Sequence, residues 1–476
     1  MPHLESIHID NDYARKQFNK SDKSRVRDAS QVEEVKRFRI GELLDRGYFK
    51  INHDETIYVG KYKEDEGQVA MIKFNSFKEM LLHEPDCVDS WDMDKDRPKE
   101  RPVAEVFLRS PLVPIYEGLC FEPNKGASFE GKYNTWRPRP VVDFEPKHDE
   151  SDELMDFIVD VICGGDEVVG DYVLQYIAHS IQRPEEKPTF ALFLRSSQGC
   201  GKGFFGRLLN KLHGNNFADP KPKEVFGGHN TMMQNRIITF IDEFHTGGSK
   251  GTDEIKSLIS EPFMWINKKF VDQYRVNNVS RYVMTTNRLG TVQFEAGERR
   301  YLYLLPSNKY EQDSQGYFKR LAKLLDDSDV IETFYAEMQN LDLEGFDPFK
   351  PIKTKGLMEE VGEHLPPVVD WLRLSVLDNS LIGFKCDSVT GMPCSARTKD
   401  IQDEIVKATG VRRKATSQDI KRELLNIGAK EVRHAKMNLR FGSEGMVDKT
   451  GRGYRFDGIT IDMIEQYLNE KYKIEV

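Results

Sequence analysis

The chain has 476 residues and a formal net charge of −9, from 78 acidic and 69 basic residues. An acidic balance argues against a protein that coats nucleic acid with its whole surface, although a local basic channel is compatible with it. No apolar run approaches the roughly 20 residues of a membrane-spanning helix, and residues 1–28 lack the apolar core of a signal peptide. We therefore expect several domains, no membrane partner, and a cytoplasmic location, in the host cytoplasm if the protein is viral.

The six cysteines are scattered along the chain without C-x-x-C spacing. Cys386 and Cys394 could supply two zinc ligands, but no second pair of ligands accompanies them. Reduced thiols without a metal are the expectation for an intracellular protein.

The first third of the chain predicts a small module without catalytic spacing. Residues 1–35 are polar and carry both charge signs, so we expect a flexible lead-in. Short strand-like runs then alternate with polar turns, which predicts an α+β module over residues 36–146. Residues 147–188 carry apolar side chains at helical spacing and predict a helical region.

A strand, a glycine loop and a helix start follow one another at 190–209. The run 190–194 is apolar throughout, which is typical of a strand covered on both faces. Gly199, Gly201, Lys202 and Gly203 come next, before apolar residues at helical spacing. This is the layout of a phosphate-binding P-loop, in which backbone N–H groups and the lysine hold an anion. The residues predicted to contact a nucleotide are Ser196, Ser197, Gln198, Gly199, Cys200, Gly201, Lys202, Gly203 and Phe204.

Two positions depart from the P-loop pattern. Ser196 stands where the first glycine is expected, and Gly203 stands where the magnesium-binding hydroxyl is expected. Gly-Lys is common at helix starts, so the downstream segments decide whether this loop binds a nucleotide.

A second buried strand, RIITFI at 236–241, ends in Asp242 and Glu243. An ATPase needs such an acidic pair, because one carboxylate holds Mg²⁺ and the other orients the attacking water. A strand that simply ends in two solvated acids is the alternative. The coincidence with the upstream Gly-Lys favours the functional interpretation.

A third strand at 280–286 leads to Asn287, and Arg299 and Arg300 precede a further apolar run. An amide at a strand tip can hold a γ-phosphate or a water, and an arginine can stabilise the charge of a phosphoryl-transfer transition state. Between the acidic strand and this one, residues 266–278 alternate basic, aromatic and apolar side chains. They predict a hairpin that either grips a single strand or is merely solvated.

The last third of the chain becomes basic. Residues 311–375 predict a helical connector, and between 395 and 440 basic residues exceed acidic ones. A helix, a turn at Gly410, a second helix over 417–426, and strand-like runs near 438–442 and 453–456 predict a winged-helix domain within 376–476. Such a domain binds DNA or docks a protein, and the charge excess favours DNA, with Arg412, Arg413 and Lys414 as candidate contacts.

In combination, these motifs resemble superfamily 3 helicases, and most closely the helicase part of phage and plasmid primase-helicase proteins. The resemblance rests on YNTW at 133–136, residues 172–205, IDEF at 241–244, and TTNR and ERRY beyond it. It implies an α/β fold with a P-loop AAA+-like parallel-sheet core at 189–310. About 130 residues precede the resemblance, too few for a primase-polymerase domain, so we expect helicase activity without primer synthesis.

The resemblance implies a role for each matched residue. Lys202 would contact the β- and γ-phosphates of ATP, Asp242 would bind Mg²⁺, and Glu243 would activate water. Asn287 would be a sensor, and Arg299 or Arg300 would reach the ATP of a neighbouring subunit. Lys256, Lys268 and Lys269 would face a DNA channel.

The resulting hypothesis is an ATP-dependent ring helicase that moves on single-stranded or forked DNA during replication of a phage or mobile element. Its expected partners are further copies of the chain, in a hexameric ring, and a separate primase or polymerase. One alternative is a DNA-initiator or assembly scaffold that binds nucleotide but hydrolyses little, because Gly203 offers no metal ligand. A P-loop kinase of small molecules is the other alternative.

Overall fold

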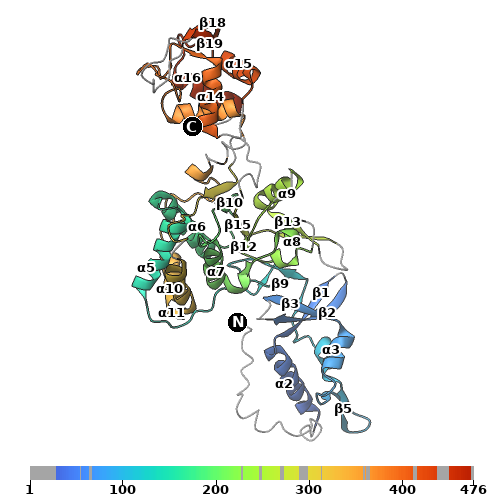
Figure 1. The fold of residues 1–476 in the computed structure, drawn as a ribbon. Coiled ribbons are helices and arrows are strands. Elements are labelled where there is room, and N and C mark those ends of the chain that lie inside the picture. The colour runs from blue at the N-terminus through green and yellow to red at the C-terminus, as the bar shows by residue number, and fades with distance from the viewer. Residues whose placement is uncertain are drawn as a thin grey trace.

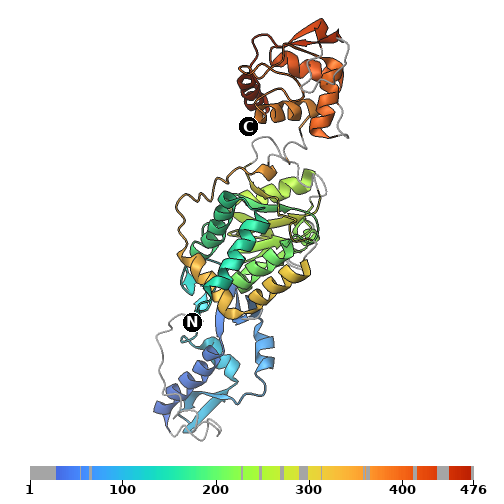
Figure 2. The same cartoon turned by 60° about the vertical axis from the view of Figure 1, so that its left-hand side comes forward.

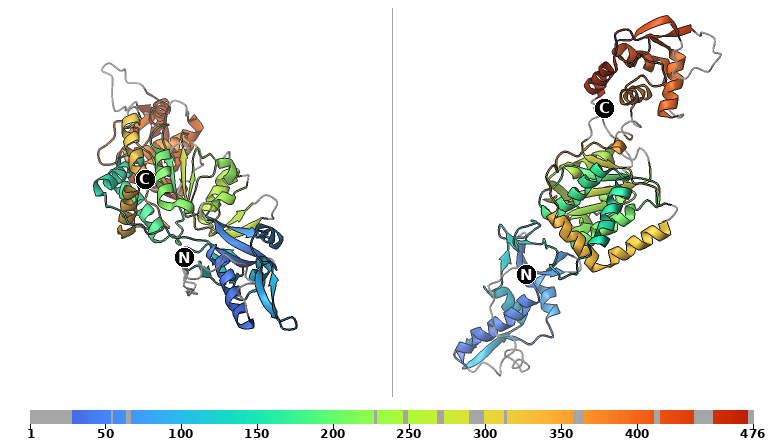
Figure 3. Two further views of the ribbon diagram at one scale, coloured as in Figure 1. Left: turned by 90° about the horizontal axis from the view of Figure 1, so that it is seen from below. Right: turned by 90° about the vertical axis from the view of Figure 1, so that its left-hand side faces the viewer.

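The computed structural model describes residues 28–53, 55–63, 67–226, 229–245, 249–267, 273–288, 299–311, 314–357, 360, 365–410, 415–436 and 450–472. These residues form an N-terminal module, a central α/β core and a C-terminal domain, which follow one another along the long axis of the molecule (Figures 1 and 3). Within these ranges, no helix has the length and apolar character needed to cross a membrane.

The N-terminal module is an α+β unit, as its short strand-like runs predict. Its main sheet has the order β3-β2-β1-β6, and helices pack over it around Ile40, Phe77 and Phe107. Helix α2 begins at Val32, so residues 32–35 are helical rather than part of a flexible lead-in, because Val32 and Val35 are buried against Val88. The bounds are α2 Val32–Asp45, β1 Tyr48–His53, β2 Thr56–Lys63, β3 Gln68–Ile72, α3 Phe74–Met80, β4 Cys87–Asp92, β5 Arg97–Arg101, α4 Val103–Arg109 and β6 Ile115–Tyr116.

A small sheet joins this module to the core, and Asn134 organises it. The strands are β7 Leu119–Cys120, β8 Ser128–Phe129 and β9 Lys132–Asn134, in the order β7-β9-β8. The buried Asn134 amide donates to the carbonyls of Glu122 and Gly126 at 2.8 and 2.9 Å, and its oxygen accepts from the N–H groups of Glu122 and Trp136 at 3.0 and 3.1 Å. Asn134, the asparagine of the YNTW stretch, therefore has a structural role.

The core contains a five-stranded sheet of order β11-β12-β15-β10-β16, in which every neighbouring pair is parallel. Four of its strands follow the buried runs that the sequence predicts, whereas no strand is predicted at β11. The bounds are β10 Ala191–Arg195, β11 Phe217–Ala218, β12 Ile238–Ile241, β15 Arg281–Thr286 and β16 Tyr301–Leu304. The prediction of an α/β fold with a parallel sheet is confirmed.

Helices cover both faces of this sheet, because successive residues of a strand point to opposite sides. Leu192 and Leu194 face a cluster that includes α6 and α7, whereas Phe193 faces one that includes α9. Figure 2 shows the first group of helices in front of the sheet. The helices are α5 His148–Asp156, continued by a π-helical turn over Phe157–Ile162, and α6 Glu167–Gln182, α7 Lys202–His213, α8 Pro222–Phe226, α9 Ser249–Ser260, α10 Ser314–Asp326 and α11 Ser328–Asn340.

Among its described residues, the C-terminal domain combines helices with a three-stranded antiparallel sheet, and two successive helices precede an antiparallel strand pair. Its elements are α13 Pro367–Leu377, β17 Ser395–Arg397, α14 Thr398–Thr409, α15 Ser417–Asn426, β18 Lys430–Lys436, β19 Thr450–Arg455 and α16 Ile461–Tyr472, with sheet order β17-β19-β18. The strand predicted at 438–442 lies outside the described residues, and β18 precedes it. Its sequence KEVRHAK is charged and buries only Ala435, which hides it from a search for apolar runs. The winged-helix assignment remains a prediction.

A buried arginine ties β15 to the end of α6. Arg281 is fully buried, and its guanidinium donates to the carbonyls of Arg183 and Glu186 at 2.8 and 2.7 Å. It also lies 2.9 Å from Nδ1 of His179. Burial, together with the Arg281 charge, lowers the pKa of His179 to about 4. The imidazole is therefore neutral at pH 7 and can accept the hydrogen bond from Arg281.

We predict that acid destabilises the core through His179. Because the pKa of His179 is about 4 in the folded protein and 6.5 for an ordinary histidine, the unfolded chain binds more protons between these pH values. The free energy of unfolding should therefore have its full value above pH 6.5. It should decrease by about 3 kcal/mol as the pH falls from 6.5 through 4. Urea unfolding of the wild type and of His179→Gln between pH 4.5 and 7.5 checks this. Parallel pH profiles for the two proteins would contradict it.

Candidate functional site

The loop between β10 and α7 surrounds the amine of Lys202. Its Nζ donates to the carbonyl oxygens of Ser196 and Ser197 at 3.0 and 2.8 Å, and to Oγ of Ser196 at 2.8 Å. The fourth contact, at 2.7 Å, is to Oδ1 of Asn287 at the end of β15. Burial lowers the pKa of Lys202, while nearby Cys200 and Asp242 oppose that shift. The sheet thus brings together Lys202 and Asn287, which the sequence places in one site.

Two glycines give the loop its shape. Gly199 and Gly201 have φ values of +88° and +85°, in the region that favours glycine. A Cβ at Gly201 would also lie 2.9 Å from the Phe318 ring and 3.0 Å from the Phe157 ring. The aromatic side chain of Phe204 points into this packing, with its ring centroid 4.9 Å from that of Phe157. Phe204 is therefore a core residue in the first turn of α7, and its side chain does not face the loop.

The acidic pair lies at the carboxyl end of the neighbouring strand. Oδ1 of Asp242 accepts hydrogen bonds from Oγ1 of Thr285 and from the N–H of Glu243, the latter at 3.0 Å. Within the described residues, no hydrogen bond reaches the other oxygen, Oδ2. Glu243 has a φ of +52°, which is uncommon outside glycine and turns the chain sharply after the strand. One carboxylate oxygen is thus fixed and the other is available.

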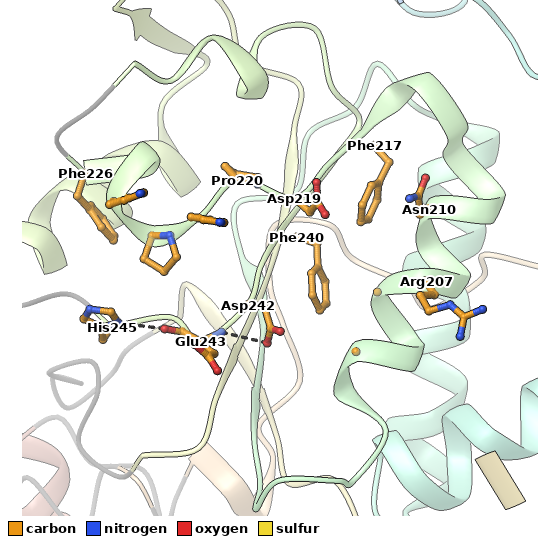
Figure 4. Close-up of a pocket in the computed structure, with 15 residues that line it drawn as sticks. Arg207, Asn210, Phe217, Asp219, Pro220, Phe226, Phe240, Asp242, Glu243 and His245 are labelled. Atoms are coloured by element: carbon orange, nitrogen blue, oxygen red, sulfur yellow. Dashed lines mark hydrogen bonds between the residues drawn. The ribbon is translucent and has the colours of Figure 1, made fainter. Parts of the chain in front are cut away.

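A cavity of about 930 Å³ lies beside the acidic pair. Figure 4 shows Asp242, Glu243 and His245 on one side, and Arg207 and Asn210 of α7 on the other. Gly203 also lines the cavity, and a Cβ added there would meet no atom within 4 Å. Space for the expected hydroxyl therefore exists, although the chain does not supply one.

The predicted arginine pair lies away from this site. Arg299 and Arg300 precede β16, at the amino end of a parallel sheet whose carboxyl end carries Lys202 and Asp242. The Nε atom of Arg300 donates to Oγ of Ser260 at 3.1 Å. Lys256 lies half-buried on α9. The remaining candidates lie outside the described residues: Lys268, Lys269, Arg412, Arg413 and Lys414.

A hairpin beyond α9 presents aromatic side chains to solvent. Strands β13 Phe263–Ile266 and β14 Tyr274–Asn277 are antiparallel, which confirms the predicted hairpin. Phe263 and Trp265 are 43% and 62% exposed on one face. The guanidinium of Arg275, which is paired with Trp265 across the hairpin, lies 4.5 Å from the centroid of the Phe263 ring.

Some residues of the site are not evident from the sequence. Thr285 touches Asp242 because the pairing of Ile241 with Met284 places the two following residues side by side. Glu311 accepts from Oγ of Ser197 at 3.2 Å, across a sequence separation that no motif covers. A polar TTN run at the end of a strand is the only sequence signal for Thr285.

The described residues contain no group of three or more His, Cys, Asp or Glu side chains arranged to hold a metal. This applies to Cys386 and Cys394, so the zinc alternative gains no support from the described part of the chain. A single carboxylate such as Asp242 suits Mg²⁺, which keeps several waters and takes other ligands from phosphates.

Residues 194–300 match a family described as "Family of unknown function (DUF5906)". The chain is also 22% identical over 312 residues to a DNA primase-polymerase of Nitratiruptor phage NrS-1. The matched region covers 59% of this chain and 41% of that protein. The chain thus spans about two fifths of the relative that it matches. An apo structure of the NrS-1 C-terminal region matches with a TM-score of 0.55 at 17% identity, over 88% of this chain and 98% of that one. A second apo structure of this region matches with a TM-score of 0.52 at 15% identity, over 89% and 99%.

These findings correct the assignment made from motifs. The relative is named a DNA primase-polymerase, so the expectations of a superfamily 3 helicase, of ATP hydrolysis, and of a helicase without primer synthesis are wrong. The physical reason is that glycine loops, acidic strand ends and polar strand tips hold nucleotides in many enzymes with parallel sheets. They report a binding geometry and do not identify a reaction.

We predict opposite effects of alanine at two neighbouring glycines. Gly201→Ala should lower the free energy of unfolding by more than about 1 kcal/mol, because a Cβ meets two rings at positive φ. Gly203→Ala should leave it unchanged or raise it by up to about 1 kcal/mol, because its Cβ enters open space in a helix. Thermal unfolding of both variants checks this, and equal losses would contradict the described loop.

Proposed function

We propose that this chain serves DNA replication of the primase-polymerase type and that the β10–α7 loop holds the triphosphate of a nucleotide together with Mg²⁺. The contacts of Lys202 carry the proposal. Its ammonium is bound to four oxygens at the mouth of a glycine loop, and a triphosphate can replace those oxygens. The first turn of α7 adds free N–H groups and the positive end of its dipole.

The location of the loop in the sheet supports the same proposal. Ligands of open α/β sheets bind outside the carboxyl ends of the strands, where Lys202, Asp242 and Asn287 lie. This geometry favours the P-loop description of the core. The ligand is a nucleoside triphosphate of any base, because no described contact distinguishes one base from another.

The residues around Asp242 fit a divalent cation. Two hydrogen bonds fix its Oδ1, and Oδ2 accepts none from the described residues, so this oxygen can serve as a ligand. Mg²⁺ held there would neutralise phosphate charge. Thr285 orients the carboxylate, and Asn287 holds the Lys202 amine in place until a phosphate accepts its hydrogen bonds.

The name of the relative supports the link to replication, and the β13–β14 hairpin offers a surface for DNA. Trp265 and Phe263 are exposed on the same face, next to the cation of Arg275. Exposed aromatic rings beside cations are typical of sites where single-stranded bases stack. Single-stranded DNA is therefore a second proposed ligand of the chain, bound at the β13–β14 hairpin.

Lys202→Ala should weaken the binding of a fluorescent nucleoside triphosphate by about 10- to 100-fold, because it removes charge-assisted hydrogen bonds to phosphate. Titration in the presence of Mg²⁺ measures the effect. Lys132→Ala, which removes an exposed lysine of β9, is the matched control and should bind as the wild type does. Unchanged affinity of Lys202→Ala would refute the loop as the nucleotide site.

The replication role is tested separately by template-dependent synthesis. With a single-stranded template, nucleotides and Mg²⁺, the wild-type chain should incorporate labelled nucleotide, and Lys202→Ala should incorporate less. A chain that binds nucleotide at Lys202 but incorporates none on any template would contradict the replication role and leave the nucleotide site intact.

Trp265→Ala should weaken the binding of a single-stranded oligonucleotide by about 5- to 100-fold, as expected from the loss of one stacked base. Trp265→Phe keeps an aromatic ring and should retain most of the affinity. Fluorescence anisotropy of labelled DNA compares the two variants. If both variants lose the same affinity, or if neither loses any, stacking on Trp265 is excluded.

A further inference from the structure

The cavity beside Asp242 extends away from the β10–α7 loop along one face of α7. Gly203, Gly206, Arg207 and Asn210 line it from the helix. These residues recur at helical spacing, so they form one continuous wall. The close approach of α7 to Phe240 requires glycine at position 206, because a Cβ there would lie 2.8 Å from the Phe240 ring. The volume of about 930 Å³ lies within the range of about 300 to 1,000 Å³ that is usual for ligand pockets.

The opposite wall is the segment Asp219-Pro-Lys-Pro-Lys223, which follows β11 and includes the first two residues of α8. Its two lysines, Lys221 and Lys223, are exposed, and neither has an ion-pair partner among the described residues. The two prolines restrict the backbone, so little backbone entropy is lost when the lysines bind a ligand. Lysines without partners on a rigid segment suit a phosphate group.

Aromatic side chains lie between the two walls. Phe217 and Phe240 are nearly parallel, with an interplanar angle of 27° and ring centroids 6.3 Å apart. Figure 4 shows both rings between the lysine segment and α7. Phe217 is only half-buried, so part of its surface faces the cavity. Cations and an accessible ring on one cavity are the groups that recognise a nucleotide unit, with its phosphate and its flat base.

We propose that this cavity is a second nucleotide subsite, which holds a phosphate on Lys221 and Lys223 and a base near Phe217. The nucleotide unit is either a free nucleotide or the end of a single strand, since the two share this chemistry. The inference rests on the proposed function for one feature: Asp242 and Glu243 line the cavity and would separate this unit from the triphosphate in the loop.

The test uses the full chain and the double variant Lys221→Ala/Lys223→Ala. One arm titrates a labelled single-stranded oligonucleotide of about ten nucleotides at several salt concentrations. The other arm measures the stoichiometry of a fluorescent nucleoside triphosphate. The matched control, Lys95→Ala/Lys99→Ala, removes two exposed lysines from the β4–β5 hairpin of the N-terminal module. Thermal unfolding verifies that each variant is folded.

For a strand end, the double variant should bind the oligonucleotide about tenfold more weakly, and the salt slope should decrease by about 1.4, which corresponds to two phosphate contacts. For a free nucleotide, the stoichiometry should fall from two to one. Either result supports the subsite when the Lys95/Lys99 control behaves as the wild type. Unchanged slope, affinity and stoichiometry would overturn it. Lys202→Ala reports on the loop separately, so failure of the subsite and failure of the proposed function are distinguishable.

Discussion

The parallel pairing of β15 with both β10 and β12 is the constraint on which the candidate site depends. The pairing of Arg195 with Thr286 brings the start of the loop beside Asn287, and the pairing of Ile241 with Met284 brings Asp242 beside Thr285. One strand therefore supplies the partner of the lysine and the partner of the carboxylate. A shift of one residue in either register would move these side chains to the opposite face.

The opposite end of the same strand is anchored by Arg281. Its guanidinium donates to carbonyl groups at the end of α6 and to Nδ1 of His179, and the second contact requires a neutral imidazole. A buried arginine is costly unless its donors are paired, and its terminal nitrogens find their carbonyl partners only where the end of α6 meets β15, while Nε has no partner among the described residues. The strand that carries Thr285 and Asn287 is thus fixed at its start, which leaves its tip well positioned.

The predictable part of the molecule is the part that local chemistry determines. The buried run at 190–194, the acidic strand end and the glycine loop are all visible in the sequence, because burial and backbone conformation constrain the residue types directly. The contact of Thr285 with Asp242 was not predictable, because it follows from sheet order. The cavity depends on the placement of the 219–223 segment opposite α7, and no motif marks that segment. The helicase assignment failed for a related reason, since its motifs describe phosphate binding rather than one reaction.

The central claim is that the β10–α7 loop and Asp242 together hold a nucleoside triphosphate and a divalent cation. A crystal structure of the chain with a non-hydrolysable nucleoside triphosphate and Mn²⁺ tests it most directly. We predict phosphate density inside the β10–α7 loop, an anomalous peak next to Asp242, and Lys202 turned from Asn287 toward phosphate. An occupied nucleotide site elsewhere, with Lys202 still bound to Asn287, would contradict it.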